Sequence, residues 1–541
     1  MPPHGRYYLA VPVLAAAVLA FAGLGQGILR HGDEARFAVA AREILHGGPW
    51  LVPTSLGEPL VIKPPLLIWL VALAGKARGE LDEFAARVPG ALAAVATVVA
   101  LYFLGARLFG PRVGLTAALL LSTTLGWFLL AREVLPDMPM TAASTAAILA
   151  AVAAAQDGTR RSALAFAAAL ALAFHFKLLA GLVPPVAAVV LVAVVRRDLS
   201  PLRALRPALA APLFLALLVP WLVRYFLVPD FLIQIDAETL GGRAWSSWRS
   251  AYQSPLRTLR VLGEALLPWS LLVPAALVYL WRRRRTLLED PLLLPLAWLA
   301  IVLAMNAAVH TVRWRYLLPA LPPAALILAM VWHERVEDAR GGLDRRLMFW
   351  LLAGLLGLFV VAGLVVLAGV DLTRLLEGDL GERLRHLPWA LVPGIWIAGG
   401  AVGLWLIRSR PRWALPICVS LVGLSLVTLE PLTRGERDRS VDARPFAAEV
   451  RAAAAGRTIG FNGGSGLVST FHFYLDAPTV LLRDADLPAA LAQPPRRRIV
   501  LPADTLEALK RQGAVSRSVT VLAEGRFGPY HLVLVESGES P

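Results

Sequence analysis

Long apolar stretches, separated by short polar and arginine-rich segments, fill most of the first 430 residues of the chain. A helix that crosses the hydrocarbon core of a bilayer needs about 20 predominantly apolar residues. On this criterion the sequence predicts thirteen membrane-spanning helices, at residues 9–29, 83–104, 113–130, 138–155, 162–174, 178–195, 207–226, 263–281, 292–309, 316–332, 347–369, 389–407 and 413–429. Residues 64–75 form a further apolar segment that suits a re-entrant helix. The pattern is that of a polytopic α-helical membrane protein.

Beyond residue 432 the pattern changes to that of a small soluble α/β domain. Short apolar runs predict strands within residues 457–464, 478–484, 496–504 and 528–537, and segments 442–453, 465–474 and 503–511 predict helices between them. We therefore predict two domains. Residues 1–432 form a transmembrane domain with a long outer loop at 30–82, and residues 433–541 form the α/β domain.

Composition and charge exclude several classes of protein. An apolar content of 57% and a mean hydropathy of +0.63 are too high for a soluble enzyme of 541 residues. The net charge of +15 does not indicate a nucleic-acid partner, because the basic residues fall in short clusters between apolar stretches. The single cysteine, Cys418, excludes an intramolecular disulfide and argues against a cysteine-ligated metal.

The distribution of arginine predicts the orientation in the membrane. With a cytoplasmic N-terminus, the inner segments hold roughly 20 Lys and Arg in about 61 residues, against roughly 17 in about 122 residues of the outer loops. The run Arg282–Arg285 then serves as a topology anchor. An odd number of spans places the C-terminal domain on the same outer, periplasmic side as loop 30–82. Residues 9–29 are predicted to be a membrane helix and not a signal peptide, because no small-x-small cleavage site follows them.

Loop 30–82 concentrates charge and proline next to the membrane. Its first part carries apolar side chains at helical spacing, namely Phe37, Ala40, Ala41, Ile44 and Leu45. They predict an amphipathic helix that rests in the membrane interface and turns its charged side toward a cavity. The charged residues of this helix are Asp33, Glu34, Arg36, Arg42 and Glu43. Lys63, followed by Pro64 and Pro65, adds a cation on rigid backbone, so one loop offers carboxylates and a lysine at membrane depth.

Five motifs follow one another in this loop: Asp33-Glu34-Ala35-Arg36-Phe37-Ala38, Ala41-Arg42-Glu43-Ile44, Gly48-Pro49-Trp50-Leu51-Val52-Pro53, Gly57-Glu58-Pro59 and Lys63-Pro64-Pro65-Leu66-Leu67-Ile68-Trp69. Their order resembles the first external loop of the GT-C type membrane glycosyltransferases that take sugars from polyprenyl-phosphate carriers, such as the lipid A aminoarabinose transferase and relatives of the protein mannosyltransferases. Each motif alone is weak, whereas the ordered set is specific. The resemblance implies a membrane transferase with its active site in this loop.

Other segments carry weaker likenesses to the same family. Asp137 lies in an R-x-x-x-P-D-x-x-x-T motif at residues 132–141, although an acidic residue there also suits the start of a helix. Lys177 resembles a family lysine, but Leu178 replaces the glycine that usually follows it, and a snorkelling lysine is the alternative. Residues 315–319 resemble the family's R-Y-L-L-P, and residues 470–475 resemble its S-x-x-F-Y-L element.

Three further predictions come from the residues of the outer loops. Arg313 and Arg315 suit a phosphate headgroup, or else snorkel from a helix end. Trp245 lies among aromatic and acidic residues of loop 227–262, which suit either a sugar-binding wall or an interfacial belt. His310 is a candidate ligand for one divalent cation, but no recognised metal motif surrounds it, so we predict no certain cofactor.

The resemblance also implies a mechanism, in which the acceptor displaces the lipid phosphate at the anomeric carbon and inverts its configuration. Lys63, assisted by Arg36, Arg313 and Arg315, would bind the donor phosphate. Asp33 would serve as the general base for a hydroxyl acceptor, and Glu34 would support it, turned away or holding Arg36. Asp137 would orient the acceptor, couple to Lys177 or share the base role. The further expected substrate contacts are Lys177, Trp245 and Tyr316.

The expected partners are a polyprenyl-phosphate sugar and an acceptor in the envelope, which is lipid A, another glycan, a lipid or a protein. Two alternatives stay open on the sequence alone. Charged residues beside the membrane also form the pathways of secondary transporters and lipid flippases, although this chain shows no internal repeat and its acids gather at one face. The second alternative is a family member that binds sugar or assists assembly without catalysis.

Overall fold

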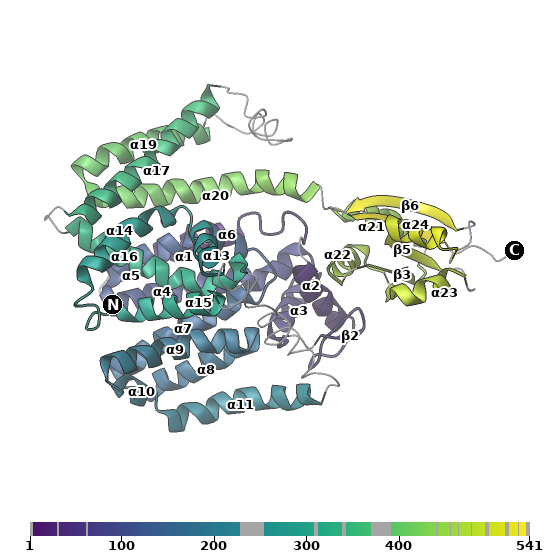
Figure 1. Ribbon diagram of the computed structural model, residues 1–541, viewed down its shortest axis with the longest axis horizontal. Helices are drawn as coiled ribbons and strands as arrows, with labels where there is room; N and C mark the ends of the chain where they lie inside the picture. The colour runs from purple at the N-terminus through teal and green to yellow at the C-terminus, as the bar shows by residue number, and fades with distance from the viewer. Residues whose placement is uncertain are drawn as a thin grey trace.

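The computed structural model describes residues 4–29, 32–60, 63–227, 254–307, 312–337, 342–368, 391–439 and 442–536, the last with short gaps at 455, 464, 478, 493–496, 514–518 and 528–529. A body of packed helices forms one end of the molecule, and an α/β region that carries the C-terminus forms the other (Figure 1). Helices α2 (Gly32–Leu45) and α3 (Leu66–Arg78) lie between the two, beside the hairpin of β1 (Thr54–Ser55) and β2 (Glu58–Pro59). Trp245 and His310 are outside the described residues.

The helical body follows the apolar stretches of the sequence. Its helices are α1 (His4–Phe21), α4 (Glu83–Phe109), α5 (Pro111–Ser122), α6 (Leu125–Leu130), α7 (Asp137–Asp157), α8 (Arg160–Lys177), α9 (Leu179–Arg196), α10 (Ser200–Ala204), α11 (Pro207–Phe226), α13 (Ser254–Ala265), α14 (Val273–Arg283), α15 (Leu293–Ala307), α16 (Leu321–Glu337), α17 (Leu343–Leu367), α19 (Leu391–Ser409) and α20 (Ala414–Arg439). The 3-10 helices η2 (Trp269–Leu272), η3 (Trp314–Ala320) and η5 (Pro411–Trp413) precede α14, α16 and α20. Every predicted span overlaps one of these helices or a pair of them.

Within the described residues, eight helices are long and apolar enough to cross a membrane, or up to nine if one bent pair counts as a span. The protein is therefore a membrane protein of mostly helical fold. The bent pair is α13 and η2–α14, which meet at 116°, so the helix expected at 263–281 is broken near its start. Helices α1, α5, α8 and α15 do not meet the same criterion of length and composition, and the count of thirteen stays a prediction.

The first predicted span, residues 9–29, is also too long. Helix α1 ends at Phe21, and residues 22–29 form turns in which Gly23 and Gly27 have positive φ angles of 67° and 80°. Arg87 of α4 holds this segment in place, because its buried guanidinium donates hydrogen bonds to four carbonyl groups. These belong to Leu24, Gln26, Gly27 and Ile28, at 2.6–3.3 Å. The five N–H donors of an arginine side chain can bond to backbone carbonyl groups that have no partner within a helix.

Helix α2 does not rest in the membrane interface as predicted. Residues 34, 35, 37–41 and 44 are all buried, so the helix is enclosed on most sides. It packs against α3 on one side and against α22 (Ser465–Leu475) of the C-terminal region on another. Alanine at positions 35, 38, 40 and 41 lets these neighbours approach closely. The hydrophobic pattern correctly placed a helix here, but the partners that cover its other faces come from distant parts of the chain.

The C-terminal region contains a five-stranded mixed sheet in the order β4-β3-β5-β7-β6. Its strands are β3 (Ile459–Phe461), β4 (Thr479–Leu481), β5 (Arg498–Pro502), β6 (Thr520–Phe527) and β7 (Tyr530–Glu536), with β3 parallel to both β4 and β5 and β7 antiparallel to its two neighbours. Side chains of β7 alternate between two apolar clusters. Leu532 and Leu534 join α21 (Arg444–Ala454) and α22, whereas Val533 and Val535 join α23 (Leu487–Ala492) and α24 (Ala503–Arg511). Helices therefore cover both faces of the sheet.

Strand β6 was not predicted from the sequence. It pairs only with β7, at the edge of the sheet, and its register shifts between Val521 and Ala523. Val521 and Leu522 are both exposed, so the strand lacks a regular alternation of buried and exposed side chains.

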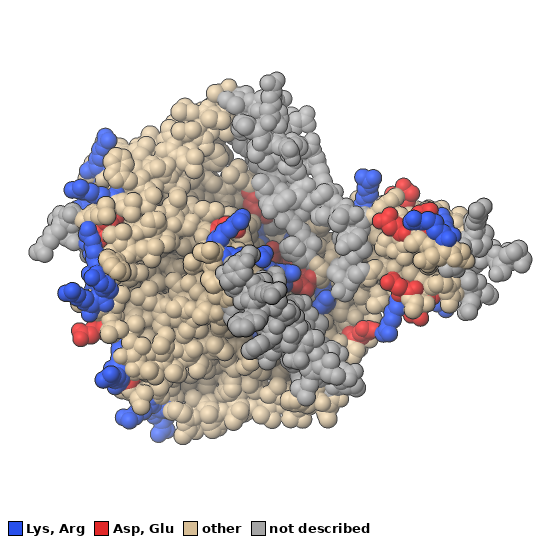
Figure 2. Space-filling view, in the orientation of Figure 1, with Lys and Arg blue, Asp and Glu red and all other residues tan. Residues whose placement is uncertain are grey.

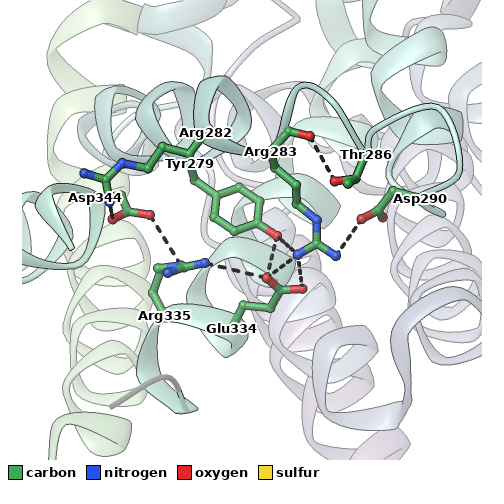
Figure 3. Close-up of polar contacts among 8 residues, drawn as sticks. All are labelled: Tyr279, Arg282, Arg283, Thr286, Asp290, Glu334, Arg335 and Asp344. Atoms are coloured by element: carbon green, nitrogen blue, oxygen red, sulfur yellow. Dashed lines mark hydrogen bonds and ion pairs between the residues drawn. The ribbon is translucent and has the colours of Figure 1, made fainter. Parts of the chain in front are cut away.

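Lys and Arg line the edge of the helical body that lies farthest from the C-terminal region (Figure 2). Part of this basic edge is an ion-pair network among α14, α16 and α17 (Figure 3). Arg283 pairs with Glu334 at 2.6 Å and with Asp290 at 2.8 Å, while Arg282 reaches the buried Asp344 at 3.2 Å. The arginine run predicted as a topology anchor thus also joins helix ends within the protein.

Candidate active site

The first turn of α2 presents Asp33 to an arginine from a distant part of the chain. The Oδ2 atom of Asp33 lies 2.8 Å from Nη1 of Arg315, which belongs to η3. The carboxylate is about one-third exposed and the guanidinium 12% exposed. A negative charge is favourable at a helix N-terminus, where the first backbone N–H groups lack partners within the helix. The fold therefore holds Asp33 ionised beside a fixed cation.

This ion pair forms part of the wall of a cavity of about 680 Å³. Its described lining residues are Gly32, Asp33, Arg36, Leu129, Leu130, Glu133, Leu135, Arg313, Trp314 and Arg315. The volume lies within the usual range for small-molecule sites. The lining includes three arginines, two acids and an aromatic ring, so the cavity can hold a polar, anionic group beside an apolar one.

A second charged group lies next to the first but does not line this cavity. The Nζ atom of Lys177 is in direct contact with Oδ1 of Asp137 and lies 4.7 Å from the ring centroid of Tyr316. The guanidinium of Arg315 lies 5.4 Å from the same ring, so Tyr316 connects the two groups. Lys63 is also here, with Nζ 5.7 Å from the ring of Phe37. The sequence-predicted partners Asp137, Lys177 and Tyr316 are thus brought together.

The electrostatic environment shifts the pKa values of Asp33 and Lys63. Burial alone would raise the pKa of the Asp33 carboxyl, but the charges of Arg315, Lys63 and Arg36 together outweigh it and hold this pKa below its usual value. For Lys63, burial and the nearby charge of Lys177 lower the pKa of the ammonium to about 8, against the raising effect of Asp137 and Asp33. Near neutral pH both side chains remain mostly charged.

Glu34 is not among the described residues that line the cavity, and its catalytic role stays a prediction. It is 2% exposed, and its Oε1 atom accepts a hydrogen bond from the backbone N–H of Val134 at 2.9 Å. The same oxygen lies 4.0 Å from Nε of Arg87. Glu34 therefore joins the first turn of α2 to the segment before α7 and to α4.

Glu43 and Arg42 of α2 also make their contacts outside the cavity. Glu43 accepts hydrogen bonds from the hydroxyl group of Thr54 and from the backbone N–H of Leu56, which fixes the β1–β2 hairpin. Arg42 donates to the backbone oxygen of Phe473 at 2.6 Å. Of the five charges expected to share one side of the helix, only Asp33 and Arg36 line the cavity.

Sequence reasoning missed two residues that line or support the site. Glu133 lies on the cavity wall, and its backbone oxygen approaches α4 closely, since a Cβ atom at Gly90 would lie only 2.9 Å from it. Its position inside the R-x-x-x-P-D motif was a usable signal. Arg87 was the other omission, although a charged residue inside an apolar stretch indicates a special role.

Arg132, the first residue of the same motif, has a structural role. It is buried and donates hydrogen bonds to the backbone oxygens of Leu19 and Ala22, and its guanidinium lies 3.6 Å from the carboxylate of Glu430. It joins α1, α20 and the segment that precedes α7.

The prediction of a metal site is not tested by this structure, because His310 lies outside the described residues. Among the residues that are described, no group of three or more His, Cys, Asp or Glu side chains is arranged to hold a metal ion. His175, near the end of α8, shares a hydrogen bond of 2.9 Å with the backbone oxygen of Leu217. Trp245 likewise stays a prediction.

Comparison with known proteins finds glycosyltransferases both among family models and among individual relatives. A family model described as dolichyl-phosphate-mannose-protein mannosyltransferase matches residues 62–223. An undecaprenyl phosphate-alpha-4-amino-4-deoxy-L-arabinose arabinosyl transferase of Sodalis glossinidius is 30% identical over 425 residues, which cover 73% of this chain and 71% of that protein. The protein of the same name from Edwardsiella ictaluri is 25% identical over 523 residues, covering 93% and 91%.

A solved structure shows the same fold. The crystal structure of ArnT from Cupriavidus metallidurans bound to undecaprenyl phosphate superposes with a TM-score of 0.79 over 98% of both chains, at 21% sequence identity.

Proposed function

Because this chain belongs to the family of undecaprenyl phosphate aminoarabinose arabinosyl transferases, we propose that it moves 4-amino-4-deoxy-L-arabinose from undecaprenyl phosphate to lipid A. It is a membrane glycosyltransferase that uses a polyprenyl-phosphate-linked sugar. The observation that carries the finer proposal is the Asp33–Arg315 pair, which stands on the cavity wall with Lys63 beside it. An acid next to several cations suits displacement of a phosphate leaving group at a sugar carbon.

The donor phosphate is placed at Lys63 and Lys177. Lys63 is the cation that the K-P-P segment holds on rigid backbone, and both ammonium groups lie close enough to influence one another. As the anomeric carbon separates from the lipid phosphate, negative charge grows on the phosphate oxygens. Cations already fixed at that position stabilise this charge without rearrangement. Lys177 also contacts Asp137, which orients it toward the reaction.

The acceptor is placed in the cavity. Arg36 and Arg313 lie on its wall, whereas Lys63 is not among its described lining residues. Guanidinium groups bind phosphate oxygens through paired hydrogen bonds. An acceptor phosphate of lipid A would fit this charge and needs no deprotonation before it attacks. Glu133 and Trp314 add a hydrogen-bond acceptor and an apolar surface for sugar groups. The assignment of Arg36 and Arg313 to the acceptor replaces the expectation that they bind the donor.

Asp33 stands between the two binding positions. Its lowered pKa makes it a weak base that stays ionised, which suits a carboxylate that offsets positive charge on the anomeric carbon in the transition state. Where the acceptor is a hydroxyl group, the same oxygen receives its proton. A single displacement inverts the anomeric configuration, and no covalent intermediate with the enzyme is required.

We place the site and the C-terminal domain, residues 433–541, on the periplasmic side of the bacterial inner membrane. Support comes from the basic edge, which lies at the end of the helical body opposite to α2 and the C-terminal region (Figure 2). Positive residues concentrate on cytoplasmic ends of membrane proteins. Thirteen spans would carry the chain from a cytoplasmic N-terminus to a periplasmic C-terminal domain.

Cysteine labelling in intact cells tests this orientation. The native Cys418 is buried, so it offers little background reactivity. A membrane-impermeant maleimide should label Glu58→Cys, an exposed position in the β1–β2 hairpin, but not Arg284→Cys at the basic edge until the cells are permeabilised. Labelling in the reverse pattern would contradict the periplasmic placement.

Donor binding should weaken as pH rises through about 8, the pKa of Lys63. Below this pH the ammonium is protonated and attracts the phosphodiester, whose charge does not change between pH 6 and pH 10. Above it, affinity should fall toward a limit of about tenfold per pH unit. Calorimetric titration with a polyprenyl-phosphate analogue measures this. Lys63→Ala should bind weakly with no such dependence, and an equal alkaline loss in that variant would contradict the assignment.

Mass spectrometry of envelope lipids tests the proposed substrates. A deletion strain should lack the aminoarabinose substituent of lipid A, and the wild-type gene should restore it whereas a gene encoding Asp33→Asn should not. Lipid A with its substituent intact in the deletion strain, together with loss of another glycan, would reassign the acceptor.

A further inference from the structure

Helix α22 of the C-terminal region lies directly against α2, the helix that carries Asp33. It presents Phe473 and Tyr474, two residues of the segment that resembled the S-x-x-F-Y-L element but had no assigned role. Phe473 is buried in the same apolar cluster as the side chains of α2 and α3. The contact is therefore a packed interface between a distant part of the chain and the loop that holds the site.

Tyr474 fixes the chain just before α2. Its hydroxyl oxygen accepts a hydrogen bond from the backbone N–H of Leu29 at 2.7 Å, and the hydroxyl group lies 3.2 Å from Oε1 of Glu83. Burial raises the pKa of Tyr474, so the group stays protonated and can donate to Glu83 while it accepts from Leu29. Leu29 lies four residues before Asp33.

Arg42 fixes the far end of the same helix. Besides its hydrogen bond to the backbone oxygen of Phe473, its guanidinium stacks 4.2 Å from the Phe473 ring centroid and lies 3.4 Å from a carboxylate oxygen of Asp476. The end of α22 is itself anchored, because Arg451 of α21 donates to the backbone oxygens of Tyr474 and Leu475 at 2.6 and 2.8 Å. Helix α22 and the residue after it thus contact both Leu29, shortly before α2, and Arg42, near the end of α2.

The opposite side of the segment before α2 is held by α4. Arg87 binds the carbonyl groups of residues 24 and 26–28, and Glu83, one turn earlier on α4, meets the hydroxyl group of Tyr474. Residues 24–29 are therefore held between α4 and the C-terminal region. A small displacement of these residues would move the first turn of α2, where Asp33 must stay within 2.8 Å of Arg315.

We propose that Tyr474 and Arg42 form a brace through which the C-terminal α/β region holds α2, and with it Asp33, against Arg315, so that Tyr474 is a positioning residue for sugar transfer. This proposal rests on the role of Asp33 argued above. It gives the C-terminal region a function in the reaction that is separate from acceptor binding. A substitution far from the reacting atoms that misplaces a reacting group by about 1 Å can lower the rate by as much as 100-fold.

The test is a double-mutant cycle with Tyr474→Phe, which removes only the hydroxyl group and keeps the packed ring. In the otherwise wild-type enzyme we expect kcat to fall about 10-fold. In the Asp33→Asn background the same change should cost less than about 2-fold, because the group being positioned is already gone. Tyr102→Phe, at a buried tyrosine of α4 outside the brace, is the matched control and should leave kcat unchanged in both backgrounds.

The pH profile separates positioning from a loss of folded protein. The charged groups that face Asp33 or share its cavity wall are Arg315 of η3, Lys63 before α3, Arg36 of α2, Glu133 before α7 and Arg313. When the contact with Arg315 loosens, the acidic limb of the kcat profile should move to higher pH. A smaller fraction of folded enzyme would lower the whole profile without moving it.

Hydrogen–deuterium exchange provides a readout that does not depend on activity. In Tyr474→Phe and Arg42→Ala, peptides that cover residues 22–45 should exchange faster than in the wild type, while peptides of β5 and β7 should not change. Unchanged exchange at residues 22–45, or an equal fall in kcat in both backgrounds, overturns the brace. Failure of the wild type to transfer aminoarabinose would instead refute the proposed substrate, and the exchange experiment would still decide the brace.

Discussion

Asp33→Asn is expected to lower the rate of sugar transfer by roughly 1,000-fold, within the range of about 100- to 10,000-fold that a positioned acid or base contributes. Asparagine keeps the size of the side chain but removes the charge that faces both Arg315 and the anomeric carbon. The loss should appear in kcat, because the phosphate-binding lysines remain. The measurement is single-turnover transfer from a synthetic polyprenyl-phosphate sugar by purified protein.

Two comparisons make this result specific. Glu58→Gln removes an exposed carboxylate from the same outer loop and should leave the rate unchanged. Thermal unfolding of Asp33→Asn, followed by circular dichroism, should show that the variant is folded. Near-normal turnover by folded Asp33→Asn would remove the carboxylate from the mechanism.

Lys63→Ala should raise the dissociation constant for the lipid-phosphate donor by about 10- to 100-fold, which corresponds to the roughly 1.5–3 kcal/mol of a hydrogen bond to a charged group. The ammonium group is the one whose pKa the buried site lowers, and a bound phosphate would restore its full charge. Binding of a non-reactive analogue to purified protein in nanodiscs measures the effect.

The matched control is Lys76→Ala, which removes an exposed lysine near the end of α3 and should bind the donor normally. Equal affinities of Lys63→Ala and the wild type would place the donor phosphate elsewhere, with the arginines of the cavity wall as the remaining candidates.

The apolar stretches allowed the helices to be located from the sequence, because the length of a membrane helix is set by the bilayer. The stretch predicted at residues 207–226 is the observed helix Pro207–Phe226. The bend between α13 and η2 was not predictable in the same way, since it falls at residues 266–268, inside the apolar stretch 263–281 that predicted one span. The end of α1 at Phe21 depends on the side chain of Arg87, which the pattern of apolar residues does not record.

The sequence predicted which residues belong to the candidate site but not how they contact one another. Motifs indicated Asp33, Lys63, Asp137, Lys177 and Arg315 separately, but their contacts join α2, the segment before α3, α7, α8 and η3. Glu34 shows why adjacent charges cannot be assigned alike, because neighbouring residues of a helix point about 100° apart. The docking of α22 on α2 was also beyond reach, since Phe473 and Tyr474 resemble ordinary core residues of an α/β domain.

Membership of the transferase family sets aside the transporter and flippase alternative. We propose that the ionised groups around Asp33 bind substrates and do not form a transport pathway. A member that binds sugar without catalysis would keep the cavity but would not depend on Asp33. The substitutions above separate that alternative from an active enzyme.

Release of the lipid carrier is the most direct test of the central claim, that the acid and cations around the cavity cleave a sugar from a lipid-borne phosphodiester. Purified protein in vesicles is given synthetic undecaprenyl phosphate aminoarabinose with or without lipid A, and free undecaprenyl phosphate is quantified. The account predicts release that depends on lipid A, matches the transferred sugar in amount and inverts its anomeric configuration. Movement of the intact donor across the vesicle membrane without cleavage, or no release with folded protein, would contradict it.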